Sequence, residues 1–534
     1  MTEDVFQADA EVRTIRRLAW SAYAEGLLDP AHAGHESVED LLRDIRVPLE
    51  RLPQWRVDLW SEFEREVRNS QRFEAIAGEW RLSAWRPRVR ALLDAAGCET
   101  LWSWGWTVGA GSEEHQLAWE VTCSFDGHMT HPCAKAKMGV AAHSLVRLAP
   151  EFEPVVPLPV AALAANVARQ YCMPHLVEQD ASPSAAAYFA SRFPACYARW
   201  DEWLRAAGED PANFVPLPVH PANLRQLASD LGPLLESGLL LLPSAEGGAL
   251  LAQPLMSMRT LLPLRGGGDG GSASKRGELA PYVKLPVPIQ ASGSHCLPLL
   301  TTAYHCLPLL TTAYLTGPVP IQATSLRRYL SPVEVQGATI LSELLLQILQ
   351  REPGIAECLY VLEEECAVHL DAPGISYESS RYVSALYRTN LAAILPDIPQ
   401  PTQPIPLAAL FASDPVTDHP ILYNILASAG AATEPVEAAR WFERHCQVVV
   451  AALVPIWLLY GVVLEMHGQN CLLLMGEDGG LRGLVFREVS ITPLKPAGQP
   501  VAVHRLPSGS SLVSHGIAWH RMASHGIAWH RMAS

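Results

Sequence analysis

"GHMTHPCAKAKMG", residues 127–139, is the stretch that decides how this chain is interpreted. It places two histidines, a cysteine and two lysines between a pair of glycines. A zinc site would use His128, His131 and Cys133, but their spacing fits no common zinc pattern. The lysines suit an anion better, because an ammonium group binds phosphate and neighbouring glycines let backbone N–H groups approach. A metal site, an anion-binding wall and an ordinary turn are therefore the three alternatives, and an anion is favoured over zinc.

The composition is that of a globular protein with more than one domain. The chain has 534 residues, of which 49% are hydrophobic and 18% charged, so we expect two or three domains. A net charge of −15 argues against a nucleic-acid partner, because phosphate contacts need a basic face. The 11 cysteines form no CxxC pair, and residues 1–12 have no apolar core. We therefore expect reduced thiols, no secretory signal and a cytoplasmic location.

One apolar segment, Val448–Leu464, resembles a membrane span in composition. It has 17 residues and contains Pro455 and Gly461, whereas a bilayer span needs roughly 20 apolar residues. We expect a fully buried helix here and no membrane partner.

Periodicity predicts helices over residues 11–28 and 57–96. The alternation in "LAWEVTCSFDGH", from residue 117, indicates a strand, with helix following to about residue 205. The last third is expected to be mostly helical, and "CLLLM" and "GLVFREV" are expected to pair across the turn "GEDGG".

An internal echo marks an insertion. "PVPIQA" occurs at 286–291 and again at 318–323, so residues 292–323 read as an insert into one continuous segment. The insert is apolar and separates Lys284 from Arg328.

Three further clusters carry chemical groups. "SMRT", Ser257–Thr260, places two hydroxyls around an arginine that can bind phosphate or carboxylate oxygens. Lys284 lies in the expected strand "VKLPV". "EMHGQN", Glu465–Asn470, and "FRE", Phe486–Glu488, offer oxygen ligands of the kind that Mg²⁺ takes beside nucleotide phosphates. Each cluster alone is also compatible with surface sequence, a solvated edge strand or a capped helix end.

In this order, the clusters resemble the NRPS-independent siderophore synthetases of the IucA/IucC type. That family carries a pattern close to G-H-P-x-H-P-x-x-K-x-R-x-G, and this chain has Met129 in place of proline and Lys137 in place of arginine. The S-x-R-T and E-x-H-G-Q-N elements are intact, "PVHPAN" at 218–223 resembles P-V-H-P-W-Q, and Glu488 replaces the aspartate of an arginine–aspartate pair. The matches run from about residue 120 to 490.

The resemblance implies an ATP-dependent ligase that adenylates a polycarboxylate, commonly citrate, and joins it to an amine or alcohol. It implies that phosphates and adenylate are held by Ser257, Arg259, Thr260, Lys284 and Arg328. It implies that the phosphates and the carboxylate are faced by His131 and Lys135, and that the nucleotide site is lined by His467, Gln469 and Asn470. The expected Mg²⁺ ligands are Glu465 and Glu488. Direct catalytic roles are expected for His131, Lys135, Arg259, Lys284 and Arg328.

The fold implied by the resemblance is α+β and shaped like a hand. We expect a helical thumb over 1–120, fingers with a mixed or antiparallel sheet and the ATP motifs over 121–340, and a shortened helical palm over 341–534. A homodimer is expected. Two alternatives to a working synthetase are a non-catalytic relative with the same fold and an ATP-dependent phosphotransferase that transfers the γ-phosphate.

Overall fold

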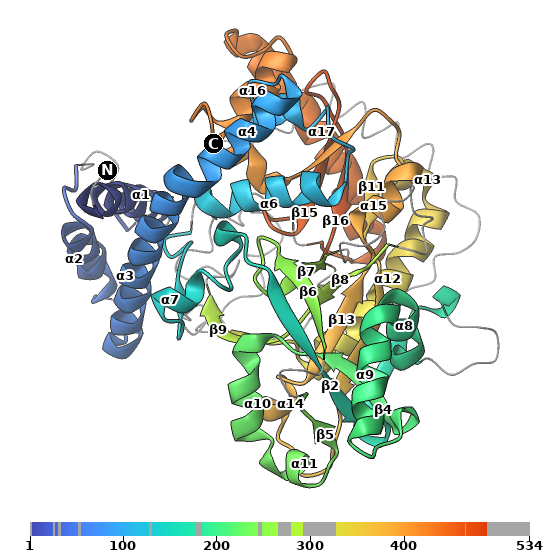
Figure 1. Ribbon diagram of the computed structural model, residues 1–534. Coiled ribbons are helices and arrows are strands. Elements are labelled where there is room, and N and C mark those ends of the chain that lie inside the picture. Colours follow the sequence, from blue (N-terminus) through green and yellow to red (C-terminus); the bar gives the residue numbers. More distant parts are fainter. Residues whose placement is uncertain are drawn as a thin grey trace.

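The computed structural model shows helices arranged around sheets that are mainly antiparallel, with one parallel pairing, β11 with β16 (Figure 1). The residues that it describes are 3–24, 27–29, 34–51, 55–127, 131–176, 184–243, 248–264, 279–291, 327–464 and 466–488. This mixture of helix and antiparallel sheet confirms the predicted α+β class.

Helices form the N-terminal part, shown in blue in Figure 1. They are α1 (Glu3–Ala24), α2 (Val38–Leu49), α3 (Val57–Trp80), a π-helical turn (Arg81–Trp85) and α4 (Arg86–Ala96). The first three share an apolar core that includes Leu18, Leu41 and Phe63. The helices predicted for this part of the chain are therefore confirmed.

The largest sheet has nine strands in the order β3-β12-β13-β8-β7-β6-β2-β4, with β5 beside β2. Every pairing in it is antiparallel. The strands are β2 (Val156–Ala164), β3 (Ala168–Cys172), β4 (Phe214–Pro218), β5 (Leu240–Leu241), β6 (Ala249–Pro254), β7 (Thr260–Pro263), β8 (Tyr282–Lys284), β12 (Glu364–Leu370) and β13 (Ser384–Arg388). Because β12 and β13 lie beyond residue 340, this sheet crosses the expected boundary between fingers and palm.

Side chains alternate between the two faces of this sheet, as the pleat requires. On β12, Cys366 and Val368 join the core beneath α8 (Ala185–Arg192) and α9 (Pro194–Ala206). Ala367 points the other way, into a core with Val335 of α12 (Pro332–Arg351). The sheet is therefore covered on both faces in this region.

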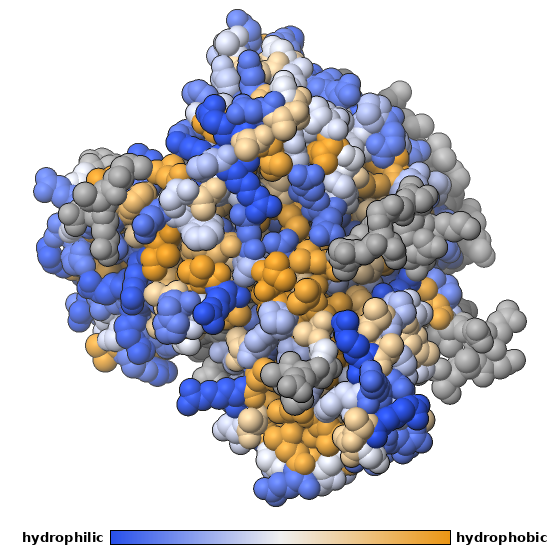
Figure 2. Space-filling view, in the orientation of Figure 1, coloured by the Kyte–Doolittle hydropathy of each residue, from blue (hydrophilic) through white to orange (hydrophobic). Residues whose placement is uncertain are grey.

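Part of the sheet is less well covered near the pairing of β2 with β6. Figure 2 shows apolar side chains in the middle of the face over these strands, with hydrophilic residues around them. Val155 and Leu251 are 51% and 50% exposed, and they flank the register pair Val156–Ala252.

Two local predictions are wrong. Instead of a strand, the segment after residue 112 forms α6 (Glu113–Asp126), which begins where the Ser112 hydroxyl accepts a hydrogen bond from the backbone N–H of His115 at 3.2 Å. Every residue from 115 to 125 except Leu117 is buried, so its apolar residues mark no single face and give no helical period. The helix expected to run to about residue 205 is interrupted by β2 and β3, which occupy most of residues 156–172.

A smaller sheet has the order β11-β16-β15-β14. Its strands are β11 (Leu359–Val361), β14 (Gln403–Pro406), β15 (Cys471–Met475) and β16 (Leu481–Phe486). β15 and β16 pair antiparallel, with Cys471 opposite Phe486, so the predicted hairpin is confirmed.

The apolar segment near the C-terminus belongs to α17 (Pro435–Tyr460), which ends at Gly461 in a left-handed conformation, φ 66°. Its buried residues are Trp441, His445, Ala452 and Ile456. They recur at intervals of four, seven and four, which is one face of a helix, and Leu458 is 54% exposed. The prediction of a fully buried helix is therefore wrong, because apolar composition does not say how many faces are covered. By length and composition α17 could span a bilayer, which is weak support for a membrane location.

A third sheet pairs a strand of residues 127–139, called the opening motif below, with the strand that follows Lys284. It consists of β1 (Lys137–Met138), β9 (Val287–Ala291) and β10 (Arg327–Arg328) in the order β1-β9-β10. Lys137 lies opposite Ala291, and Arg328 lies opposite Val287. The insert, 292–323, lies outside the described residues, but the strands on either side of it still pair.

The remaining helices are short. They are α5 (Leu101–Trp104), α7 (Ala142–Leu145), α10 (Leu224–Asp230), α11 (Gly232–Glu236), α13 (Pro353–Ala356), α14 (Tyr377–Ser380), α15 (Leu391–Ile394) and α16 (Ile421–Ser428).

Deletion of residues 292–323 is predicted to leave the fold intact and to stabilise it. The connection between β9 and β10 would shrink to residues 324–326, which lowers the entropic cost of closing the loop by up to about 2 kcal/mol. Urea unfolding followed by circular dichroism measures the change. An insoluble product, or a lower unfolding free energy than that of the full chain, would contradict the pairing of β9 with β10.

Candidate active site

Buried charges lie where the nine-stranded and four-stranded sheets pack together. In the apolar layer between the sheets, Leu262 and Tyr282 meet Leu472 and Val485. Beside this layer, Oε1 of Glu488 accepts hydrogen bonds from Nη2 of Arg259 at 3.0 Å and from Nζ of Lys284.

Each of these three charged groups is placed by a different strand. Arg259 directly precedes β7, Lys284 ends β8, and Glu488 follows β16. Thr260 lies opposite Lys284 in the antiparallel register, which brings the "SMRT" segment beside the lysine strand. Nη1 of Arg259 also donates to the backbone carbonyl of Tyr329 at 2.7 Å, just after Arg328. The fold thus joins elements that are far apart in the chain.

A second ion pair, which the sequence did not reveal, lies next to this cluster. Nε and Nη2 of Arg388 donate to Oε1 of Glu364 at 3.0 and 2.5 Å, and both residues are 2% exposed. The register shifts between Glu364 and Cys366, and such a bulge re-aims side chains. The shift turns Glu364 toward Arg388, away from the face that Cys366 occupies.

Burial and the neighbouring charges together shift the pKa values of the groups in this cluster. Burial alone would raise the pKa of Glu488, but the charges of Lys284 and Arg259 outweigh it and lower that pKa well below its usual value. Burial lowers the pKa of Lys284, and the nearby positive charge of Arg259 adds to this effect. Burial raises the pKa of Glu364, against the charges of Arg388 and Lys284.

The cluster has more positive than negative groups. Arg259, Lys284 and Arg388 face two carboxylates, those of Glu488 and Glu364. Within the part of the chain that the structure describes, the buried Nε of Arg259 has no hydrogen-bond partner. A buried donor without an acceptor is costly, so this arrangement suits an anionic ligand with several oxygens, such as a polyphosphate.

Glu120 on α6 holds two of these elements in place, and it too was missed. Oε2 of Glu120 accepts a hydrogen bond from the backbone N–H of Met256 at 2.9 Å, and Oε1 accepts from Nη1 of Arg487. Arg487 directly precedes Glu488 and donates through Nε to the Gln469 carbonyl at 2.5 Å. One buried carboxylate therefore positions both the "SMRT" segment and the end of β16. Glu120 was missed because the sequence predicted a strand where the structure has α6.

Hydrogen bonds from backbone N–H groups shape two turns of the site, Ser257–Thr260 and His467–Asn470. The Thr260 N–H donates to the Ser257 carbonyl at 2.9 Å. In the other turn, the Gln469 N–H donates to Nδ1 of His467 at 3.3 Å, and the Asn470 N–H donates to the His467 carbonyl at 2.9 Å.

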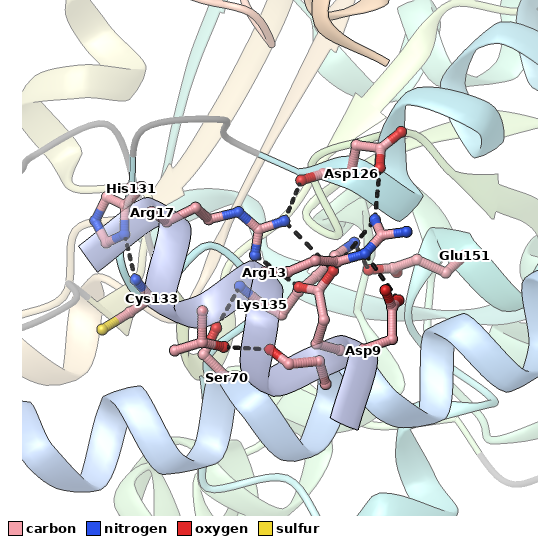
Figure 3. A network of polar contacts seen from close by, with 12 residues as sticks. Asp9, Arg13, Arg17, Ser70, Asp126, His131, Cys133, Lys135 and Glu151 are labelled. Carbon is pink, nitrogen blue, oxygen red and sulfur yellow. Dashed lines mark hydrogen bonds and ion pairs between the residues drawn. The ribbon is translucent and has the colours of Figure 1, made fainter. Parts of the chain in front are cut away.

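The opening motif forms a second charged cluster (Figure 3). Nζ of Lys135 donates to Oε1 of Glu151 at 2.8 Å and to the Ser124 carbonyl, and Nζ of Lys137 lies 3.4 Å from the same carboxylate oxygen. Burial alone would raise the pKa of Glu151, but the two lysines lower it to about 2. Burial lowers the pKa of Lys135, and Glu151 opposes this effect.

Helix α1 is tied to the start of this motif by arginines. Nη1 of Arg13 lies 2.9 Å from Oδ1 of Asp126, and Arg17 donates to the Asp126 carbonyl at 2.9 Å and to Glu74 at 2.7 Å. Asp126 also accepts from the backbone N–H of Ser413 at 2.9 Å. Figure 3 shows Arg13 and Arg17 next to Asp126, the last residue of α6. The N-terminal helices therefore help to fix the motif that follows.

Two of the residues named by the zinc hypothesis, His131 and Cys133, contact each other. No group of three or more His, Cys, Asp or Glu side chains that could hold a metal occurs in the described ranges. Nδ1 of His131 accepts the backbone N–H of Cys133 at 3.0 Å, and burial raises the pKa of the Cys133 thiol well above its usual value. His128 lies outside the described residues.

The structure brings only some of the predicted site residues into direct contact. Arg259, Lys284 and Glu488 meet, and Ser257 and Thr260 lie in the turn beside them. His467, Gln469 and Asn470 are connected to Glu488 through Arg487, whose backbone N–H donates to the Asn470 carbonyl at 3.0 Å. The pairing of β1 with β9 brings the strand after His131 and Lys135 beside the strand that follows Lys284. Glu465 and the side chain of Arg328 lie outside the described residues.

The chain belongs to the IucA/IucC family, which its residues 116–295 and 307–412 match. Residues 439–529 match a second family, described as ferric iron reductase FhuF-like transporter. The resemblance seen in the sequence motifs is thus confirmed.

Two curated proteins are among those to which the chain is similar. An uncharacterized protein, y4xN, of Sinorhizobium fredii is 28% identical over 79% of this chain and 59% of its own length. D-ornithine–citrate ligase of Staphylococcus aureus is 22% identical over 32% of this chain and 26% of its own. The chain spans about three fifths of the length of the first of these relatives.

Solved structures share the fold. Aerobactin synthetase IucC of Klebsiella pneumoniae has a TM-score of 0.61 and 16% identity, covering 91% of this chain and 78% of that one. ATP-bound aerobactin synthetase IucA of the same organism has a TM-score of 0.55 and 20% identity, covering 84% and 65%. The predicted fold class is confirmed by these neighbours.

Substitution Glu120→Ala is predicted to destabilise the fold by roughly 3–5 kcal/mol, because it leaves the buried Arg487 guanidinium unpaired. Urea unfolding measures the loss. The matched control is Glu39→Ala, which removes an exposed partner of Arg68 at 2.6 Å and is expected to cost less than about 1 kcal/mol. Equal losses in the two variants would show that Glu120 does not hold these elements.

The free energy of unfolding is predicted to fall as the pH drops from about 5 toward 2. The pKa of Glu151 is lowered from 4.5 to about 2, so the folded state favours its ionised form and loses that advantage on protonation. The contribution lost is about 3 kcal/mol. Urea unfolding of wild type and Glu151→Gln across this range should give a shallower pH dependence for the variant. Parallel profiles would contradict the assignment.

Proposed function

We propose that the chain is an ATP-dependent ligase of siderophore synthesis. It activates a polycarboxylate, citrate or a similar acid, as an acyl adenylate and joins it to an amine or alcohol. The observation that carries this proposal is the buried cluster of Arg259, Lys284 and Glu488 in a chain of the IucA/IucC family. The citrate ligase among the relatives and the ATP-bound synthetase among the structural neighbours support it.

The cationic cluster suits the chemistry of adenylate formation. When a carboxylate oxygen attacks the α-phosphate, negative charge grows on the phosphate oxygens and on the departing pyrophosphate. Buried cations that are already in place stabilise such charge more strongly than water does. Arg259 and Lys284 are held ready for this task, and we propose that Arg388 adds a third charge behind them.

Glu488 balances the charges of Arg259 and Lys284. We propose that the incoming phosphates replace its carboxylate as the partner of Arg259 and Lys284. Its carboxylate is also one of the proposed Mg²⁺ ligands, with Glu465 as the other, and Mg²⁺ would supply neutralisation of phosphate charge. Glu488 has the oxygen chemistry that Mg²⁺ requires.

We propose supporting roles for the other predicted site residues. Ser257, Thr260 and Arg328 would hold phosphate oxygens, and His467, Gln469 and Asn470 would line the nucleotide site. His131 would face the carboxylate substrate. Because Nζ of Lys135 is engaged by Glu151 and the Ser124 carbonyl, we propose that Lys135 acts mainly by fixing the motif around His131. We further propose that the enzyme works as a cytoplasmic homodimer on small molecules.

A product assay distinguishes the proposal from its alternatives. The full-length chain is incubated with ATP, Mg²⁺, an amine or amino-alcohol, and either citrate or another di- or tricarboxylate. Pyrophosphate and AMP would support the ligase, ADP would indicate a phosphotransferase, and no acid-dependent turnover would indicate a non-catalytic relative.

Substitution Arg259→Ala is predicted to lower acid-dependent pyrophosphate release by about 100-fold to 1,000-fold, because it removes a preorganised donor from the developing charge. Arg259→Lys should recover only part of the activity, since a lysine keeps the charge but not the forked geometry. The control is Arg169→Ala, an exposed residue that pairs with Asp371 at 2.6 Å. Near-normal turnover of Arg259→Ala would count decisively against this site.

A further inference from the structure

A pair of cysteines faces each other across two strands, away from the charged site. Cys172 is the last residue of β3, the edge strand of the nine-stranded sheet, and Cys366 lies on the neighbouring strand β12. The two residues are direct partners in the antiparallel register, and their Sγ atoms lie 2.7 Å apart. Both are free thiols.

The backbone at this point already has the geometry of a cross-strand link. The N–H of Met173 donates to the carbonyl of Glu365 at 2.8 Å, so Met173 and Glu365 form a hydrogen-bonded pair. Hydrogen-bonded and non-hydrogen-bonded pairs alternate along an antiparallel ladder, so Cys172 and Cys366 form a non-hydrogen-bonded pair. In such pairs the Cα atoms are about 4.5 Å apart, which lies within the range that disulfides span.

We propose that Cys172 and Cys366 form an oxidisable thiol pair that closes to a cross-strand disulfide. The oxidant is a peroxide or a small disulfide such as oxidised glutathione. This modification site is independent of the proposed ligase activity.

The two thiols differ in access, which assigns them different roles. Cys172 is half-buried at the sheet edge, whereas Cys366 is fully buried with 0% exposure. The hydrogen bond from Cys366 lowers the pKa of the Cys172 thiol, and burial opposes that effect. Burial raises the pKa of Cys366 well above its usual value. Since the thiolate is the reactive form, Cys172 meets the oxidant and Cys366 resolves the product.

The reaction balances with hydrogen peroxide as the two-electron oxidant. The Cys172 thiolate attacks one peroxide oxygen, the O–O bond breaks, and a sulfenic acid and water form after proton transfer. The Cys366 sulfur then attacks the Cys172 sulfur, the S–O bond breaks, and the second water leaves. Two thiols and one peroxide thus give one disulfide and two waters. With oxidised glutathione, the same disulfide forms and two glutathione thiols are released.

A third thiol nearby provides a matched control. Cys196 on α9 is 4% exposed and belongs to the same apolar core as Cys366, and Cys172 packs against this core. Cys196 belongs to the helical layer rather than to the ladder, so it has no register partner in the sheet. It should take no part in the disulfide.

The test is oxidation of the full-length protein with hydrogen peroxide, followed by acid quenching, alkylation under denaturing conditions and peptide mass spectrometry. We expect a linked peptide pair containing Cys172 and Cys366 that has lost two hydrogen atoms, and loss of alkylation at both residues. Dithiothreitol should restore both sites.

Cysteine-to-serine variants test whether the disulfide joins these two residues. Cys172→Ser and Cys366→Ser should each abolish the linked peptide, while Cys196→Ser should leave it unchanged. Oxygen addition at Cys172 without a link to Cys366, or a link from Cys172 to Cys196, would overturn the proposal. The wild-type peptide map gives this answer by itself, even if a variant fails to fold.

Discussion

The carboxylate of Glu488 connects the two main sheets through charge. One of its oxygens accepts hydrogen bonds from Arg259, which precedes β7 of the nine-stranded sheet, and from Lys284, which ends β8 of that sheet. Glu488 itself follows β16 of the four-stranded sheet. Removing such charges from water is expensive, so each partner depends on the others remaining in place. The packing of the two sheets and the positions of the cations therefore depend on each other.

Helix α6 holds the elements around this contact in place. Near its middle, Glu120 holds Arg487 and the Met256 backbone, and at its end, Asp126 takes contacts from Arg13 and Ser413. Figure 1 shows the helix crossing the centre of the molecule between the N-terminal helices and the sheets. The charged site and the opening motif are thus positioned from the same buried helix. Nearly complete burial of α6 is what allows its few carboxylates to act so strongly.

Local signals in the sequence were sufficient for elements whose partners lie nearby. The hairpin of β15 and β16 has two apolar runs and a glycine-rich turn, and the N-terminal helices have one apolar face each. Apolar periodicity did not predict a helix at α6, which is buried on almost all sides. At α17 it did not predict that the apolar residues are only partly covered. Neither case can be decided locally, because periodicity reports the contrast between faces and not the number of neighbours.

The same limit applies to the site. Short motifs identified Arg259, Lys284 and Glu488, because their residue types suit phosphate and metal chemistry. Glu120 gave no such signal, since its importance comes from contacts with residues 136 and 367 positions away. Glu364 depends on a shift in strand register that turns it toward Arg388, and no pattern in the sequence marks that shift.

We propose that the cations around Glu488 serve the transfer of an adenylyl group to a carboxylate. It is tested most directly with citrate labelled with ¹⁸O in its carboxylates, incubated with the full-length chain, ATP, Mg²⁺ and an amine. We expect one labelled oxygen per turnover in AMP, because the carboxylate oxygen that attacks the α-phosphate leaves with it when the amine displaces AMP. Label in inorganic phosphate, together with ADP and unlabelled AMP, would rule out adenylyl transfer.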